Sequence, residues 1–226
     1  MTIPRVLEPE AMDTPEEARD YDAMDHRAVN AQFVSDFLAA HGPSWGGAIL
    51  DVGTGTALIP IALGRADPRA LIVGLDLAEA MLALARRNVA QAGLSDRIRL
   101  ERGDGKRLDY AAGNFEAVLS NTIVHHIAEP APALAEMARL VAPGGTLFVR
   151  DLARPSTREE VAHLVTTHAG AESPQARGLF EASLHAALTP EEVRELVRSL
   201  GLPAEGVAMT SDRHWTWTWR PGSRRG

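Results

Sequence analysis

The chain has 226 residues, of which 45% are hydrophobic and 23% charged, and a formal net charge of -7 at pH 7. This composition is typical of one soluble domain. The absence of cysteine excludes disulfides, thiol nucleophiles and zinc–thiolate sites. The negative charge disfavours nucleic acid as a partner. Because no signal peptide is recognisable and no apolar run approaches the roughly 18 residues of a membrane span, we expect a cytoplasmic protein without a membrane partner.

Residues 1–47 are predicted to be helical and to act as a lid. Within 23–42, the apolar residues recur with helical spacing: Val29, Phe33, Val34, Phe37 and Leu38. Tyr21 lies near the start of this segment, where its aromatic hydroxyl can reach a carboxylate. We therefore count Tyr21 among the candidate site residues.

From residue 48 onward, short apolar runs alternate with helix-periodic segments, which is the pattern of a parallel sheet built from βαβ units. The predicted strands are 48–53, 71–76, 97–102, 115–121 and 145–152. A helix is predicted within 78–93, and another within 129–145 should keep Val141 on its buried face before Pro143 ends it. We take 48–152 as the core that binds a ligand.

The C-terminal part adds helices and an antiparallel strand pair. Two helices are predicted in a cap insert, residues 153–188, and a capping box of Thr189 and Glu192 begins a third. Strands at 206–210 and 214–219 follow; the alternating Trp215, Trp217 and Trp219 are expected to pack under a helix. The predicted fold is one α/β domain, 1–226. It has a doubly wound, mostly parallel seven-stranded sheet with an antiparallel last strand, N-terminal helices and a helical cap insert, and residues 189–219 form its last helix and strand pair.

A glycine turn follows the first of these strands. Gly53 and Gly55 allow backbone N–H groups to approach a ligand closely. Leu58 occupies the position of the third glycine in a dinucleotide fingerprint, which weakens the case for pyrophosphate binding. At the ends of the next two strands, Asp76 can accept hydrogen bonds from ribose hydroxyls, and Asp104 can accept one from an adenine amino group.

The stretches "LDVGTGTA", "GDGKRL", "SNTIVHHI" and "LVAPGGTLFVRDL", with Asp76 between the first two, resemble a class I S-adenosylmethionine-dependent methyltransferase. The resemblance implies S-adenosyl-L-methionine as cofactor. Asp51 would anchor its amino group, Asp76 its ribose, and Asn121 would lie beside its sulfonium. Ala57 departs from the family's fuller pattern, in which a third glycine often stands. The complete set of implied cofactor-binding residues is Tyr21, Asp51, Gly53, Thr54, Gly55, Asp76, Leu77, Met81, Asp104, Gly105 and Asn121.

These features predict methyl transfer by in-line displacement to a small-molecule acceptor with an oxygen or nitrogen nucleophile. His125 and His126 are candidate catalytic bases for a hydroxyl acceptor; the alternative is that one caps a helix and the other is packed. We expect no metal site, because no acidic cluster accompanies the pair in the sequence. Two other functions stay open, a noncatalytic S-adenosylmethionine-binding protein and a nicotinamide-dependent oxidoreductase. We allow for a homodimer.

Overall fold

The computed structural model describes residues 3–8, 13–23 and 26–222. Internal contacts group the chain into two compact units. Unit 1 comprises Met1–Glu10, Thr122–Ala131 and Arg150–Trp217; unit 2 comprises Ala11–Asn121, Pro132–Val149 and Thr218–Gly226. The prediction of a single domain with the four parts given above stays a prediction.

The strands form one seven-stranded sheet in the order β3-β2-β1-β4-β5-β7-β6. The prediction of a mostly parallel sheet that ends in an antiparallel pair is confirmed, because β1 pairs in parallel with β2 and β4, β2 with β3, and β6 antiparallel with β7. Their bounds are β1 (Ala48–Val52), β2 (Leu71–Asp76), β3 (Ile98–Arg102), β4 (Phe115–Asn121), β5 (Val141–Leu152), β6 (Val207–Met209) and β7 (His214–Trp219).

β1 lies where the strand order reverses, with β2 on one side and β4 on the other. Its residues Ile49, Leu50 and Val52 are buried, as expected for a central strand with both faces covered. Asp51 pairs with Gly74 of β2 and Leu119 of β4, so the carboxyl ends of the three strands lie at the same edge. In open α/β sheets, ligands bind at this edge and at such a reversal.

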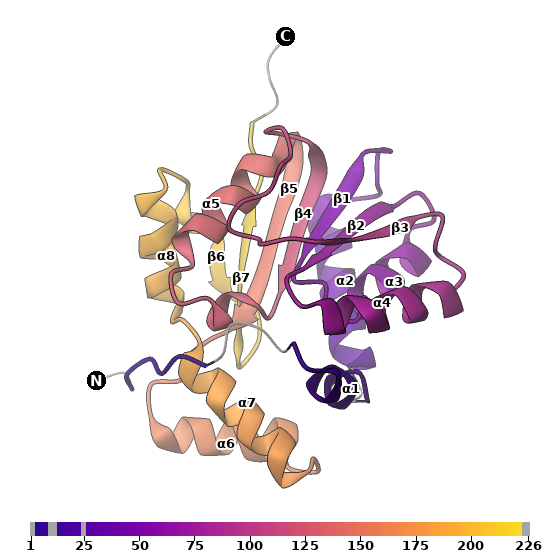
Figure 1. Ribbon diagram of the computed structural model, residues 1–226. Helices are drawn as coiled ribbons and strands as arrows, with labels where there is room; N and C mark the ends of the chain where they lie inside the picture. Colours follow the sequence, from indigo (N-terminus) through magenta and orange to yellow (C-terminus); the bar gives the residue numbers. More distant parts are fainter. Residues whose placement is uncertain (1–2, 9–12, 24–25, 223–226) are drawn as a thin grey trace. The chain divides into compact units, whose positions relative to one another are not determined.

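The helices of unit 2 are α1 (Pro15–Ala23), α2 (Arg27–His41), α3 (Leu58–Ala66), α4 (Glu79–Gln91) and α5 (Ala131–Leu140), the first residue of α5 belonging to unit 1. In this unit, α3 and α4 lie beside β2 and β3 (Figure 1), while α2 packs on α3 and α1 on α4. A continuous core joins Phe33 and Phe37 to Leu63, Ala85 and Phe148.

Two helical predictions in this region need correction. Val29 was expected on the apolar face of α2, but its side chain is 41% exposed, because the buried face is formed by Phe33, Val34 and Phe37 further along the helix. Val141 was expected in the last turn of α5, whereas it begins β5. A proline makes helical geometry unfavourable for the residue before it, here Ala142. The helix therefore ends before Pro143, earlier than the apolar spacing suggests.

Unit 1 contains the two helices of the cap insert, α6 (Arg158–Ala169) and α7 (Pro174–Ala186), which pack side by side (Figure 1). They enclose Leu152, Leu164 and Leu184 together with Ile3 from the N-terminal segment. α8 (Pro190–Ser199) begins with the predicted capping box. Two short 3₁₀ helices complete the unit, η1 (Val124–His126) and η2 (Ala204–Gly206).

The prediction for the tryptophans of β7 is confirmed for burial at two of the three positions, since Trp215 and Trp217 are fully buried while Trp219 is only partly buried. Their packing under a helix stays a prediction.

Among the residues that the structure describes, no helix is long and apolar enough to cross a bilayer.

Candidate cofactor site and histidine cluster

The glycine turn between β1 and α3 has a left-handed backbone at alternate residues. The φ angles are +76° at Gly53, +54° at Gly55 and +64° at Ala57. The N–H groups of Gly53 and Thr54 donate to the carbonyl of Leu75 on β2, which holds the turn against the neighbouring strand. Ala57 therefore takes the conformation that a third glycine would have, at the modest cost that an L-residue incurs there.

Three buried oxygen atoms of the turn have no hydrogen-bond partner among the described residues: Asp51 Oδ2, Thr54 Oγ1 and Thr56 Oγ1. Unsatisfied buried polar atoms are costly, so a set of three marks a place where a ligand's polar groups can be satisfied. Burial raises the pKa of the Asp51 carboxyl to about 7; the nearby Thr54 side chain opposes the shift and the charge of Asp76 adds to it. The positive charge of a bound ammonium group would stabilise the charged form of the Asp51 carboxyl and lower its pKa again.

Asp76 is the last residue of β2, and its carboxylate links the glycine turn to the start of α4. Its Oδ2 accepts from the N–H of Gly55 at 2.7 Å and its Oδ1 from the N–H of Ala78 at 2.9 Å. Burial raises the pKa of this carboxyl, while the backbone donors hold it down. Because a carboxylate has about four acceptor positions, Asp76 keeps capacity for ribose hydroxyls.

Apolar surface suited to an adenine lies beside Asp76. Leu77 is 39% exposed, an unusual value for a leucine next to a buried strand, and Met81 is buried on α4. Met81 packs with Ala18 of α1, and Tyr21 joins the same cluster. α1 therefore covers Met81, one of the two apolar residues predicted to flank the adenine.

Tyr21 lies over the glycine turn, with its ring 3.8 Å from the position of a Cβ on Gly55. Burial raises the pKa of its hydroxyl to about 12, with further contributions from Asp76 and Asp51. The ring stacks on His26 at a centroid distance of 4.6 Å. The structure thus brings Tyr21 together with Asp51, Gly55 and Asp76, although they are separated along the sequence.

The other predicted cofactor residues stand at neighbouring strand ends. Asp104 follows β3, is partly exposed, and accepts from the N–H of Lys106 at 2.9 Å. A Cβ on Gly105 would lie 2.8 Å from Val52 Cγ1, so the close packing there requires glycine. Asn121 is the last residue of β4, and Thr122 beyond it has a φ of +61°, which turns the chain sharply.

His125 and His126 belong to unit 1 and lie on η1. His125 is 1% exposed, and its Nδ1 is 2.5 Å from Asp151 Oδ1. Its Nε2 is 3.2 Å from Glu8 Oε1, which also lies 3.4 Å from Nδ1 of His126. Burial alone would lower the pKa of His125, but Asp151 and Glu8 outweigh it and raise the pKa to about 9.

Glu8 and Asp151 are the residues that sequence reasoning missed. The premise that no acidic groups accompany the histidines is wrong in three dimensions, because the N-terminal segment and the end of β5 each bring one carboxylate to the pair. The only local signal was "RD" at the end of a predicted strand, where functional groups gather in this type of sheet. Nothing near Glu8 in the sequence distinguishes it.

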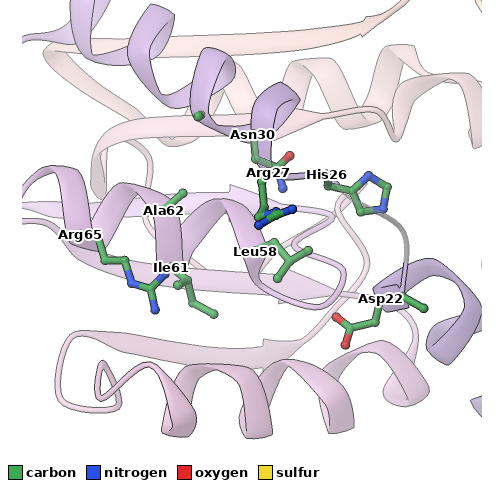
Figure 2. A pocket seen from close by; sticks show the side chains of 10 residues that line it. Asp22, His26, Arg27, Asn30, Leu58, Ile61, Ala62 and Arg65 are labelled. Atoms are coloured by element: carbon green, nitrogen blue, oxygen red, sulfur yellow. The ribbon is translucent and has the colours of Figure 1, made fainter. Parts of the chain in front are cut away.

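A further cavity in unit 2, of about 570 Å³, lies between the end of α1, the start of α2, and α3. Figure 2 shows polar and apolar side chains around it, including Asp22, His26, Arg27 and Leu58. None of the predicted cofactor residues lines this cavity. It adjoins the helix that follows the glycine turn.

The fold and the glycine turn together define a class of enzyme, and comparison with known proteins agrees with it. A model of the methyltransferase domain matches residues 49–145. The chain is 31% identical over 185 residues to a demethylmenaquinone methyltransferase of Deinococcus radiodurans, covering 76% of this chain and 73% of that protein. The chain belongs to the class I S-adenosylmethionine-dependent methyltransferases and uses S-adenosyl-L-methionine.

Solved structures show the same fold at low sequence identity. A SAM-dependent methyltransferase from Aquifex aeolicus has a TM-score of 0.68 at 16% identity, covering 91% of this chain and 97% of that one. The plantazolicin methyltransferase BamL, in complex with SAH, also has a TM-score of 0.68 at 16% identity, covering 86% and 71%. Family membership favours an active methyltransferase over the noncatalytic and nicotinamide-dependent alternatives.

Proposed function

We propose that the chain transfers the methyl group of S-adenosyl-L-methionine to a small molecule that presents an oxygen or nitrogen nucleophile. The sulfonium supplies an already activated methyl carbon, so the protein mainly has to align the two reactants and exclude water. A small acceptor is supported by the names of similar proteins, which act on demethylmenaquinone and plantazolicin. The net charge of -7 gives no support to a nucleic-acid acceptor.

The observation that carries the cofactor assignment is the set of unpaired buried oxygens of Asp51, Thr54 and Thr56 at a turn with positive φ angles. In this proposal, Asp51 anchors the amino group and Asp76 holds the ribose. Leu77 and Met81 flank the adenine, while Asp104 and Gly105 meet its edge. Gly53 and Gly55 pass beneath the methionine part, and Asn121 lies beside the sulfonium.

The proposed lid begins with α1. Its support is the contact of Ala18 and Tyr21 with Met81 in unit 2, which covers the proposed adenine wall. A segment that closes over a ligand should lose amide exchange when the ligand binds. We expect residues 13–23 to gain protection from hydrogen exchange with S-adenosylhomocysteine, whereas equal exchange in both states would make α1 a fixed cover. A similar closing role for the 153–188 insert stays a prediction.

Of the two histidines predicted as catalytic bases, we keep only His126 as a candidate. Both ring nitrogens of His125 already face carboxylates, Asp151 on Nδ1 and Glu8 on Nε2, so neither nitrogen is free to receive a proton from an acceptor. His126, whose side chain is 15% exposed, is the more accessible of the two.

Calorimetry and a methylation assay test this function. We expect S-adenosylmethionine and S-adenosylhomocysteine to bind the folded chain, and a panel of phenols, hydroxyquinones and amines to include at least one acceptor that gains the mass of a methyl group. The Asp76→Ala variant should bind both cofactors more weakly, whereas Asp212→Ala, an exposed carboxylate in unit 1, should bind them as the wild type does. Binding of neither cofactor at millimolar concentration would overturn the cofactor site; binding without turnover of any acceptor class would favour the noncatalytic alternative.

A further inference from the structure

Three potential metal ligands converge in unit 1. Glu8, His125 and His126 each contribute one ligand atom, and these atoms lie within 4.8 Å of one another. Two imidazole nitrogens with one carboxylate oxygen form a common ligand set for divalent transition metals, particularly zinc. The set combines a residue of the N-terminal segment with two adjacent residues of η1.

Two of the three separations between these atoms match those of a tetrahedral metal site. Ligands about 2.0–2.1 Å from a tetrahedral zinc ion are separated from one another by about 3.3–3.4 Å. Glu8 Oε1 lies 3.2 Å from Nε2 of His125 and 3.4 Å from Nδ1 of His126. The third separation, between the two ring nitrogens, is no more than 4.8 Å, so the three atoms can converge on one ion once the imidazole rings adjust.

The Glu8 oxygen gives a second, independent observation. Oε1 is buried and has no well-aligned hydrogen-bond donor among the described residues, although, against the opposing effect of burial, His125, His126 and Ser183 lie close enough to lower the pKa of the Glu8 carboxyl. It nevertheless lies between two ring nitrogens. An ordinary ion pair would align an N–H with this oxygen, whereas a metal ion would instead accept lone pairs from all three atoms.

Asp151 would orient His125 as a ligand. Its Oδ1 lies 2.5 Å from Nδ1 of His125, which assigns the proton of a neutral ring to Nδ1 and leaves Nε2 as the coordinating atom. The carboxylate is itself fixed by the N–H groups of Val124 at 2.5 Å and Leu152 at 2.6 Å. A carboxylate behind a metal-binding histidine is a recurrent feature of zinc sites.

The segment that carries Glu8 is held in place close to the cluster. Arg5 donates to the carbonyl oxygens of Ala186 at 2.7 Å, His125 at 3.1 Å and Ile127 at 3.0 Å. The N–H of Val6 donates to the carbonyl of His185 at 3.0 Å. These bonds tie residues 5–6 to η1 and to the end of α7, which reduces the ordering that Glu8 needs in order to bind a ligand.

We propose that Glu8, His125 and His126 bind a divalent transition-metal ion, with zinc preferred, and that Asp151 positions His125 for this role. Nitrogen ligands disfavour calcium and magnesium, which take oxygen donors. Glu8 and His126 are 12% and 15% exposed at their side chains, so the site has a route to solvent.

Zinc binding to the full chain tests the site. After treatment with a chelator and dialysis, the chain is titrated with Zn²⁺ in a calorimeter, and its metal content is measured after desalting. We expect about one tightly bound ion per chain, and at least about 100-fold weaker binding for Glu8→Gln and for His126→Ala. The matched control is His168→Ala, which removes a histidine that faces Asp212 in the same unit and lies outside the cluster.

A Co²⁺ titration adds a spectroscopic readout of the same site. Wild-type chain and His168→Ala should show the visible absorption of a four-coordinate ion with nitrogen ligands, and the two cluster variants should lose it. Circular dichroism verifies that each variant is folded. Absence of tight zinc binding in the wild type, or tight binding retained in both cluster variants, would overturn the proposal. S-adenosylhomocysteine binding, measured separately, tests the methyltransferase function without reference to the metal.

Discussion

The glycine turn and Asp151 beside the histidine cluster both bury side-chain oxygen atoms, but those of the turn lack partners among the described residues whereas Asp151 has several. At the turn, Asp51, Thr54 and Thr56 each keep a buried oxygen without a partner among the described residues. In the cluster, the carboxylate of Asp151 accepts from several backbone and side-chain donors. The turn is therefore prepared for polar groups that a ligand brings, whereas Asp151 is already satisfied by the chain itself.

Substitutions in the two regions should therefore affect different quantities, the affinity for the ligand at the turn and the folding stability at Asp151. Removing a group that awaits a ligand should cost ligand binding and little folding stability, since that group contributes few bonds in the free protein. Removing a group in a satisfied buried network should cost folding stability, because its partners are left buried and unpaired. The two regions therefore predict opposite signatures for single substitutions.

The largest expected effect is on stability, at Asp151. Asp151→Ala should lower the free energy of unfolding by about 3–5 kcal/mol, because it leaves His125 and the N–H groups of Val124 and Leu152 buried without their acceptor. Urea denaturation monitored by circular dichroism measures the change. The control, Asp212→Ala, removes an exposed partner of His168 and should cost less than about 1 kcal/mol. Similar losses in both variants would contradict the distinction drawn between the two regions.

Asp76→Ala should show an intermediate effect, mainly on affinity. We expect about 1–3 kcal/mol of lost S-adenosylhomocysteine binding, or roughly 5- to 150-fold, because ribose hydroxyls would lose a charged acceptor and the N–H of Gly55 its partner. Calorimetric titration measures it. Unchanged affinity in a folded variant would remove Asp76 from the cofactor site.

Asp51 should make cofactor binding depend on pH. Burial raises the pKa of its carboxyl to about 7 in the free protein, and an ammonium group favours the charged form. Affinity should therefore be greatest above pH 7 and decline as pH falls through 7, by up to about tenfold per unit. Asp51→Asn should bind more weakly at pH 8 and lose this dependence. Parallel pH profiles for wild type and Asp51→Asn would show that Asp51 does not contact the charged group.

The smallest effect is expected at Ala57. The φ of +64° at Ala57 costs an alanine about 1 kcal/mol. Ala57→Gly removes this cost, but glycine loses more conformational entropy on folding, which destabilises the protein by a comparable amount. Stability should therefore change by less than about 1 kcal/mol and cofactor affinity by less than about twofold. Thermal denaturation and calorimetry verify both values. A large loss of affinity would mean that the Ala57 methyl group itself contacts the cofactor.

The sequence by itself was sufficient for the features that depend on neighbouring residues. Continuous apolar runs predict buried parallel strands, and the capping box of Thr189 and Glu192 predicts the start of α8, because the forces involved act over a few residues. The carboxyl ends of parallel strands share one edge, so the order of strands and turns along the chain is enough to assign Asp51 and Asp76 to the same site.

Only the tertiary structure decided which distant groups meet. Glu8 and Asp151 reach His125 from separate segments, and no periodicity or local motif records such a contact. Tyr21 joins the glycine turn through the packing of Ala18 on Met81, and the exposure of Val29 depends on what α2 packs against. Local sequence patterns reflect short-range backbone preferences and burial, whereas a site assembled across the fold depends on long-range packing that those patterns leave open.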